Sequence, residues 1–176
     1  MKYVIPQKPK VLFIGINPHY GSYHNGVPFS NNKSFWYLLS RSGLISENIE
    51  TLRNNKSLKK FYLNEFGKKY CYGFVNLIDR PTRSVSELRK GEETAGVKKV
   101  RRLLLAEKPS IACFVGKITY QKFSGLKNVK FGLQPYKIGR CRIFVSRFPI
   151  RGPSSIRINE FRFIGRIIKS HSRSAI

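Results

Sequence analysis

The residues best suited to chemistry lie in one short stretch, Val11-Leu-Phe-Ile-Gly-Ile-Asn-Pro18. Its apolar run is typical of a fully buried strand, and the segment Gly15-Ile-Asn-Pro18 ends that strand abruptly. In open α/β sheets, ligands bind in the crevice outside the carboxyl ends of the strands, so we expect Asn17 to face a binding site. A carboxamide can hold a water molecule or the edge of a base, but it cannot remove a proton outright.

Other residues that could act as nucleophiles or bases lack the arrangement that those roles require. Asp79 is the only aspartate, and its position beside Arg80 favours an ion pair or a turn cap over catalysis. No G-x-S-x-G motif marks a nucleophilic serine. Val115-Gly-Lys-Ile-Thr119 lacks the first glycine of a phosphate-binding loop, so this segment predicts a strand-to-helix turn.

The potential metal ligands are also scattered. The histidines stand at positions 19, 24 and 171, which is not a metal-binding spacing. Cys71, Cys113 and Cys141 form no C-x-x-C pair, and the first two lie in apolar, strand-like runs. Buried free thiols in a reducing compartment are therefore expected. We predict neither a metal nor a redox cofactor.

The composition indicates one folded domain with a strongly basic surface. The chain has 176 residues, 41% hydrophobic content and a formal net charge of +25, which excludes a disordered protein and favours a polyanionic partner. Nucleic acid is the commonest such partner, while adaptation to ionic conditions or a ribosome-associated habit is the alternative. Residues 1–10 contain no apolar signal region, and no apolar run is long enough for a membrane span, so we expect an intracellular protein.

Apolar patterning predicts an alternation of strands and helices. Strands are expected over Val11–Ile16, Cys71–Leu77, Ile111–Val115 and Arg142–Val145, and helices over Ser34–Ser42, Thr94–Glu107 and Glu160–Ser170. This alternation implies a parallel sheet that is covered on both faces, hence a three-layer α/β/α fold in one domain, residues 1–176. The long connection His19–Lys33 is expected to be a functional loop, and residues 170–176 a flexible basic tail.

Several motifs occur in a characteristic order. They are Gly15-Ile-Asn-Pro18, then Gly26-Val-Pro-Phe29 with Ser34-Phe-Trp36, then Gly73-Phe-Val-Asn-Leu-Ile-Asp-Arg-Pro-Thr82 with Ser86-Glu-Leu88, and finally Val115-Gly-Lys117 with Tyr120 and Phe123. Together they resemble the mismatch-specific uracil/thymine DNA glycosylases of the uracil-DNA glycosylase superfamily. The similarity runs from about Val11 to Ser155, which is most of the chain.

The resemblance implies a base-excising hydrolase with a central four-stranded parallel sheet. Asn17 matches the catalytic asparagine that positions the water attacking the sugar C1′, and Phe29 matches the aromatic residue on which the flipped base stacks. Asn76 falls at the family's polar position facing the base, and Ile16 is grouped with these base-binding residues. Ser22 lies where a small residue leaves room for a methyl group at C5 of the pyrimidine. Without the resemblance, core packing would explain Phe29 and a strand-end cap would explain Asn76.

Two segments depart from the family pattern. His19 replaces the glycine that commonly follows the first motif; it is either a contact to phosphate or water, or an exposed loop residue. The Pro-Ser motif that inserts into the duplex should follow the last strand almost directly, whereas here Ser146–Gly152 intervenes. Matching Pro153, Ser154 and Ser155 to that motif makes Ile156 and Arg157 the candidate wedge. Arg147 and Arg151 are then expected to contact phosphates.

Two functional hypotheses follow. The first is a monofunctional DNA glycosylase that releases uracil, with thymine as a second candidate, opposite guanine in double-stranded DNA. Such an enzyme would act as a monomer and would need no cofactor. The second is a basic α/β module that binds nucleic acid without chemistry. Only base release distinguishes them, because both predict salt-dependent binding to nucleic acid.

Overall fold

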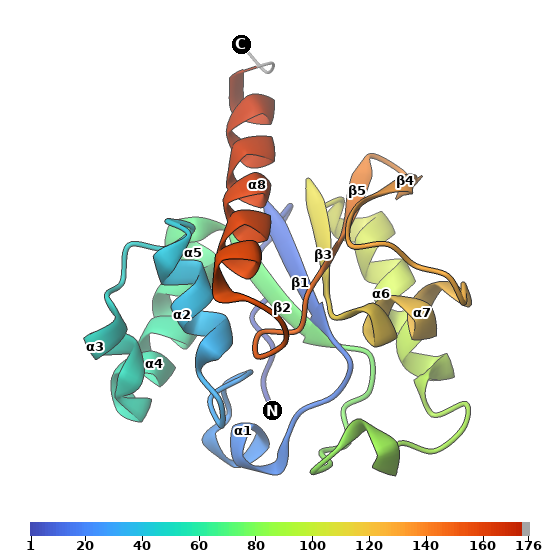
Figure 1. Cartoon of the computed structure of the whole chain (residues 1–176), viewed down its shortest axis with the longest axis horizontal. Helices are drawn as coiled ribbons and strands as arrows, with labels where there is room; N and C mark the ends of the chain where they lie inside the picture. The colour runs from blue at the N-terminus through green and yellow to red at the C-terminus, as the bar shows by residue number, and fades with distance from the viewer. Residues whose placement is uncertain (174–176) are drawn as a thin grey trace.

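Within residues 1–173, which the computed structural model describes, five strands form one sheet in the order β2-β1-β3-β5-β4 (Figure 1). Four of them are parallel and lie where the sequence predicts strands, to within two residues at each end. Their bounds are β1 Val11–Gly15, β2 Tyr72–Asn76, β3 Ile111–Val115 and β5 Cys141–Ser146. The expected parallel core of the fold is therefore present.

The fifth strand, β4 (Gly132–Ile138), was not predicted, so the sheet is mixed rather than four-stranded and parallel. It pairs with β5 in antiparallel orientation at the edge of the sheet. Its sequence, GLQPYKI, contains a glycine, a glutamine and a proline, and most of its side chains are exposed. An edge strand tolerates such residues because only one of its sides pairs with another strand. β4 therefore lacks the apolar run from which a strand could be predicted.

Helices cover both faces of the sheet, as Figure 1 shows, in agreement with the predicted three layers. Side chains alternate along β1, so Val11 and Phe13 pack into one core cluster while Leu12 and Ile14 pack into another. The bounds of the helices are α1 Tyr20–Asn25, α2 Ser34–Arg41, α3 Ile49–Arg53, α4 Asn55–Phe61, the π-helix η1 Tyr62–Phe66, α5 Gly67–Tyr70, the 3-10 helix η2 Val85–Glu87, α6 Glu93–Glu107, α7 Lys117–Ser124 and α8 Ser154–Arg173.

The helices differ from the predictions in where α8 begins and ends and in the connection after Asn17. Helix α8 begins at Ser154 rather than Glu160, and its first turn includes the backbone hydrogen bond from Arg157 to the carbonyl of Pro153. The same helix continues through residue 173, whereas a tail was expected from residue 170, and residues 174–176 lie outside the described residues. The connection after Asn17 contains the short helix α1. The strand-to-helix turn predicted at residues 115–119 is confirmed, because β3 leads through Gly116 into α7.

Helix α6 approaches the end of β2 so closely that one of its positions must be glycine. A Cβ on Gly96 would lie 1.6 Å from the carbonyl oxygen of Leu77 and 2.5 Å from its carbonyl carbon. Leu77 in turn donates its backbone N–H to the carbonyl of Gly15 at 3.0 Å. The contact therefore holds the chain leaving β2 against the chain leaving β1.

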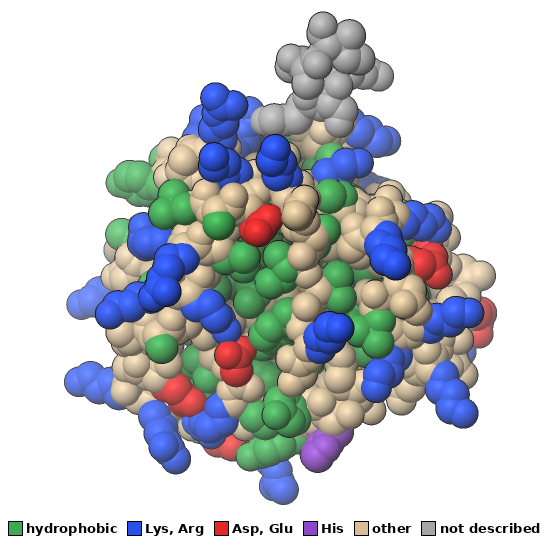
Figure 2. All heavy atoms as spheres, turned by 180° about the vertical axis from the view of Figure 1, so that it is seen from behind, with side chains coloured by type: hydrophobic (Ala, Val, Ile, Leu, Met, Phe, Trp, Pro, Cys, Tyr) green, Lys and Arg blue, Asp and Glu red, His purple; other side chains and the backbone are tan. Residues whose placement is uncertain are grey.

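The surface is basic and the thiols are free. Lys and Arg side chains are spread over the face drawn in Figure 2, where acidic side chains are few. Cys113 and Cys141 are buried, Cys71 is partly buried, and all three are free cysteines, as predicted. Among the residues described, no helix is both long enough and apolar enough to cross a membrane.

Candidate functional site

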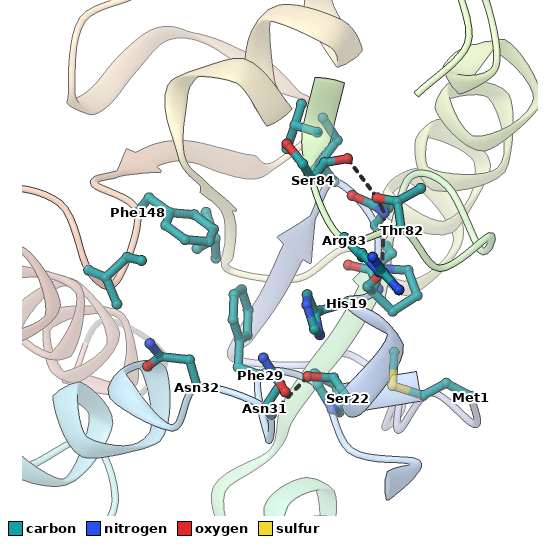
Figure 3. Close-up of a pocket in the computed structure, with 18 of the residues that line it drawn as sticks. Met1, His19, Ser22, Phe29, Asn31, Asn32, Thr82, Arg83, Ser84 and Phe148 are labelled. Carbon is teal, nitrogen blue, oxygen red and sulfur yellow. Dashed lines mark hydrogen bonds between the residues drawn. The ribbon is translucent and has the colours of Figure 1, made fainter. Parts of the chain in front are cut away.

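A pocket of about 300 Å³ opens at the carboxyl ends of β1 and β2 (Figure 3). It brings together all five residues that the sequence analysis assigned to base binding and catalysis, namely Ile16, Asn17, Ser22, Phe29 and Asn76. The sequence did not predict the rest of the lining, which includes His19, Phe74, Thr82, Arg83, Val115, Phe148 and Ile150. The location agrees with the rule that ligands of α/β sheets bind beyond the strand ends.

Hydrogen bonds leave only one possible orientation for the amide of Asn17. The hydroxyl of Thr82 donates its single proton to the carbonyl of Ser84 at 2.8 Å, so it can only accept from Asn17. The Nδ2 of Asn17 donates to this hydroxyl at 2.7 Å and also lies 3.2 Å from the carbonyl of Pro18 and 3.4 Å from that of Arg80. Its Oδ1, which accepts no hydrogen bond from any described residue, is left to accept one from a water molecule.

The segment that carries Thr82 is held against β1 by its own backbone. Thr82 donates its N–H to the carbonyl of Pro18 at 3.1 Å, and His19 and Thr82 form an isolated parallel bridge. Thr82 is also almost completely buried. The hydroxyl that orients Asn17 therefore belongs to a well-fixed residue. Thr82 is the last residue of the Gly73–Thr82 motif, but the sequence pattern indicated no role for its side chain.

The predicted pairing of Asp79 with Arg80 is wrong. Asp79 accepts hydrogen bonds from Lys99 at 2.9 and 3.0 Å and from the hydroxyl of Tyr3 at 2.9 Å. Arg80 instead donates to Glu92 at 2.6 and 2.8 Å, and this hydrogen-bonded guanidinium is the main cause that lowers the pKa of Glu92 to about 2. The two neighbouring side chains therefore reach different partners. Both pairs tie the segment after β2 to the region of α6.

Phe29 is held in a backbone conformation that a phenylalanine rarely adopts. Its φ angle is 54°, and the turn around it is fastened by the indole of Trp36, which donates to the carbonyl of Pro28 at 2.7 Å. One face of its ring stacks on Phe35 with centroids 4.8 Å apart, and the half-buried ring lines the pocket. Strain of this kind concentrates at functional sites, and here it presents an aromatic face to the cavity.

Asn76 is the last residue of β2 and is 2% exposed. It lies opposite Gly15 in the parallel register, and its Oδ1 occupies the space where a side chain of Gly15 would stand. A Cβ on Gly15 would come 2.2 Å from that oxygen. Glycine at position 15 is therefore what allows the Asn76 amide to lie at the pocket.

Ser22 and His19 order the loop that follows Asn17. The Oγ of Ser22 accepts the backbone N–H of Asn31 at 3.0 Å, which closes the loop across the pocket. The Nδ1 of His19 accepts the N–H of Gly21 at 3.1 Å and caps helix α1, so the ring proton of neutral His19 stands on Nε2. His19 is exposed and lines the pocket, so it is a helix cap as well as a residue of the site.

The segment Pro153–Arg157, predicted as the wedge, is not among the residues that line this pocket. Residues 154–157 form the start of helix α8, and Pro153, Ser154, Ser155 and Ile156 are exposed. Phe148 and Ile150 occupy the pocket mouth instead, in a turn closed by the hydrogen bond from the N–H of Arg151 to the carbonyl of Phe148 at 2.9 Å. Arg151 lines a second cavity beside the first.

Phe148 and Ile150 carried a signal that the sequence analysis did not use. Phe148 lies two residues beyond the end of β5, as Asn17 lies two residues beyond β1, and Ile150 is in the same turn. The carboxyl ends of parallel strands meet at the same edge of a sheet. Figure 3 shows Phe29 and Phe148 close together, and their ring centroids are 6.0 Å apart. The rule that selected Asn17 would therefore have selected these two residues.

The pocket has polar groups but no acid. Of the residues described, no Asp or Glu lines it, and no group of three or more His, Cys, Asp or Glu side chains could hold a metal ion. The arrangement can orient a water molecule through Asn17, stack a planar ring on Phe29 and offer amide and imidazole donors. It is suited to binding and polarising a flat, polar molecule.

Comparison with known proteins agrees with this geometry. A family model described as "Uracil DNA glycosylase superfamily" matches residues 1–170. A relative from Schizosaccharomyces pombe, named G/U mismatch-specific uracil DNA glycosylase, is 30% identical over 151 residues. The match covers 80% of this chain and 44% of the relative, so the chain spans less than half of that protein's length.

Proposed function

The chain belongs to the uracil DNA glycosylase superfamily, which confirms the resemblance seen in its motifs, and from this premise we propose that it is a DNA repair glycosylase. Its reaction is the hydrolysis of the N-glycosidic bond of uracil mispaired with guanine in double-stranded DNA, leaving an abasic site. Thymine opposite guanine is the second candidate substrate. The observation that carries the proposal is the fixed amide of Asn17, whose free Oδ1 can hold the attacking water.

The pocket has the size and lining that a single flipped base requires. An enzyme acting on a base inside a duplex must extrude it, stack it on an apolar or aromatic group and read its Watson–Crick edge. A volume of about 300 Å³ is at the small end of ligand pockets. Phe29 would supply the stacking face and Asn76 the hydrogen bonds, while the buried Ser22 stands where the family's small residue leaves room for a methyl group.

The absence of acids among the described pocket residues fits the chemistry of this bond. Its cleavage passes through a positively charged, oxocarbenium-like sugar, which the phosphates of the DNA itself can stabilise. The protein then has to orient water and stabilise the departing pyrimidine anion through preorganised donors. A neutral asparagine activates water weakly, so slow turnover is expected.

We assign the wedge to the turn at the pocket mouth rather than to the start of α8. Ile150 is 51% exposed at this mouth, and Arg83 and Arg151 flank the pocket and the adjoining cavity. Apolar side chains serve as wedges between base steps, and neighbouring cations contact phosphates without reading sequence. In this proposal Ile150 fills the gap that the flipped base leaves.

The decisive experiment measures base release from duplexes that carry one G·U, G·T or A·U pair, and from the single strand with uracil. We expect release from the G·U duplex to be fastest. Binding to all of these substrates without release from any of them would instead favour the non-catalytic nucleic-acid-binding module, which the net charge of +25 also permits.

The wedge assignment predicts different outcomes for two exposed isoleucines. Ile150→Ala should slow release from duplex DNA by roughly tenfold or more, because unstacking a base step costs a few kcal/mol that the wedge offsets. Release from single-stranded DNA should change little. Ile156→Ala, a matched change at a side chain that is 40% exposed, should leave both rates unchanged. If Ile156→Ala slowed base release from duplex DNA and Ile150→Ala did not, the wedge would be assigned to α8 instead.

A further inference from the structure

A separate cavity, of about 870 Å³, lies at the opposite ends of the strands from the base pocket. Its lining includes Lys10, just before β1, and Tyr72, the first residue of β2, whereas Asn17 and Asn76 lie at the other ends of these strands. Figure 1 shows α8 and α5 beside these strand starts, away from α1. A five-residue strand spans about 17 Å, so this cavity and the base pocket are separate sites.

The cavity is strongly cationic, and we call it the basic cleft. It is lined by Lys10, Arg162, Arg166 and Lys169, none of which pairs with a carboxylate of the described chain, and by Lys69, which pairs with Glu47 at 2.8 Å. None of the acids that the structure describes lines the cleft. Like charges facing one space repel one another, so the free energy of this arrangement falls when an anion binds between them.

A tyrosine hydroxyl in the same cleft makes no hydrogen bond to another described residue. Tyr72 is 5% exposed and lines the cleft, and its hydroxyl makes no hydrogen bond to the part of the chain that the structure describes. Burial raises the pKa of Tyr72 to about 12, so the group stays protonated and remains a donor. The neighbouring Tyr70, whose ring stacks on Tyr72 at 5.7 Å, already donates to Glu47 at 2.7 Å. The Tyr72 hydroxyl is therefore a donor that an anion in the cleft can use, beside the four cationic side chains.

We propose that the basic cleft binds the phosphate backbone of a second nucleic acid strand, with Tyr72, Arg162, Arg166 and Lys169 as the contacting residues. Arg and Lys side chains together with a hydroxyl donor are the groups that proteins use to hold phosphates. A duplex whose flipped base enters the pocket lies along the other edge of the sheet, so the strand in the cleft is a separate segment. The inference does not depend on whether the pocket releases a base.

The test counts the bound strands. A labelled oligodeoxyadenylate, which offers no uracil or thymine, is titrated into the wild-type protein and the stoichiometry is measured by native mass spectrometry and calorimetry. We expect two strands for each wild-type chain and one for Arg162→Gln/Arg166→Gln/Lys169→Gln. The salt dependence of the lost event should have a slope of roughly −2, since each phosphate contact on a single strand contributes about −0.7.

Two further variants separate a site from general charge. Lys56→Gln/Lys59→Gln/Lys60→Gln removes the same charge from exposed positions of α4, outside the cleft, and should keep both binding events. Tyr72→Phe keeps the ring and should weaken the second event about tenfold, the effect of one hydrogen bond to a charged group. Base release from G·U DNA should be unchanged in all three, so failure of this site is distinguishable from failure of the glycosylase proposal.

Three outcomes would overturn the inference. One is a single strand bound by the wild-type protein. The second is an equal loss of binding in the α4 and α8 variants, which would indicate net charge alone. The third is occupation of the cleft by pyrophosphate, detected as a Tyr72-dependent calorimetric signal, with no second oligonucleotide bound. That result would assign the cleft to a small phosphate ligand.

Discussion

Asn17→Ala is expected to reduce base release from a G·U duplex by about 10²–10³-fold, the loss typical for removing one preorganised polar group from a catalytic site. Binding of the duplex should change little, because the phosphate contacts that dominate affinity lie elsewhere. Single-turnover release and binding at the same salt concentration measure the two effects. Release at the wild-type rate would remove Asn17 from the mechanism.

Asn17→Asp is a more specific test, because the structure predicts that a stronger base at this position would not speed base release. An aspartate would direct its second carboxylate oxygen toward the hydroxyl of Thr82 and the carbonyls of Pro18 and Arg80, all of which accept from Asn17. The carboxylate would therefore be repelled from the position that orients Oδ1. We expect Asn17→Asp to release uracil more slowly than the wild type at neutral pH. Wild-type release would show that these three acceptors do not control the amide.

Gly96→Ala is expected to cause the largest loss of stability, about 2–4 kcal/mol in the free energy of unfolding. Alanine inside a helix normally gains about 1 kcal/mol over glycine. Here its methyl would lie 1.6 Å from the carbonyl oxygen of Leu77, and a backbone atom cannot move aside like a flexible side chain. Helix α6 or the end of β2 must shift to make room for the methyl group, and this overpacking lowers the free energy of unfolding. Urea denaturation measures the change.

Gly165→Ala is the matched control for this prediction. Gly165 also lies inside a helix, α8, but a Cβ there would meet only the Cδ2 of Leu44 at 3.3 Å, a side-chain atom that can yield. This variant should be within about 1 kcal/mol of the wild type. If both variants unfolded at the same urea concentration, the close packing of α6 on Leu77 would not be a determinant of stability. Because that packing also holds the segment carrying Thr82, Gly96→Ala should lower base release as well.

The sequence predicts the parallel strands well because each of them is buried on both faces. β1 and β3 are continuous runs of apolar residues, and a run of this length and composition is typical of a buried strand. β4 carries no such run, since an edge strand that is exposed to solvent can contain Gln134, Pro135 and Tyr136. The start of α8 was missed for a related reason, because its first turn is exposed and has no apolar periodicity.

The candidate site was predicted in part. Asn17 follows from its position at a strand end, and the resemblance added Phe29, Asn76 and Ser22; all four line one pocket. Phe148 and Ile150 were not predicted because the wedge was sought in the pair Pro153-Ser154, which lies where helix α8 begins. In this loop, position after β5 indicates the residues that line the pocket, whereas the Pro-Ser pair does not line it.

The sequence alone determined the local structure. It showed which segments form the buried strands and that a neutral amide, Asn17, follows the first of them. The orientation of that amide was decided by the tertiary structure, through a hydroxyl on Thr82, and so was the pairing of Asp79 with Lys99 rather than with its neighbour. The basic cleft likewise assembles residues from β2 and α8. Periodicity encodes contacts between near neighbours, whereas these contacts join distant segments that meet only when the sheet and helices pack.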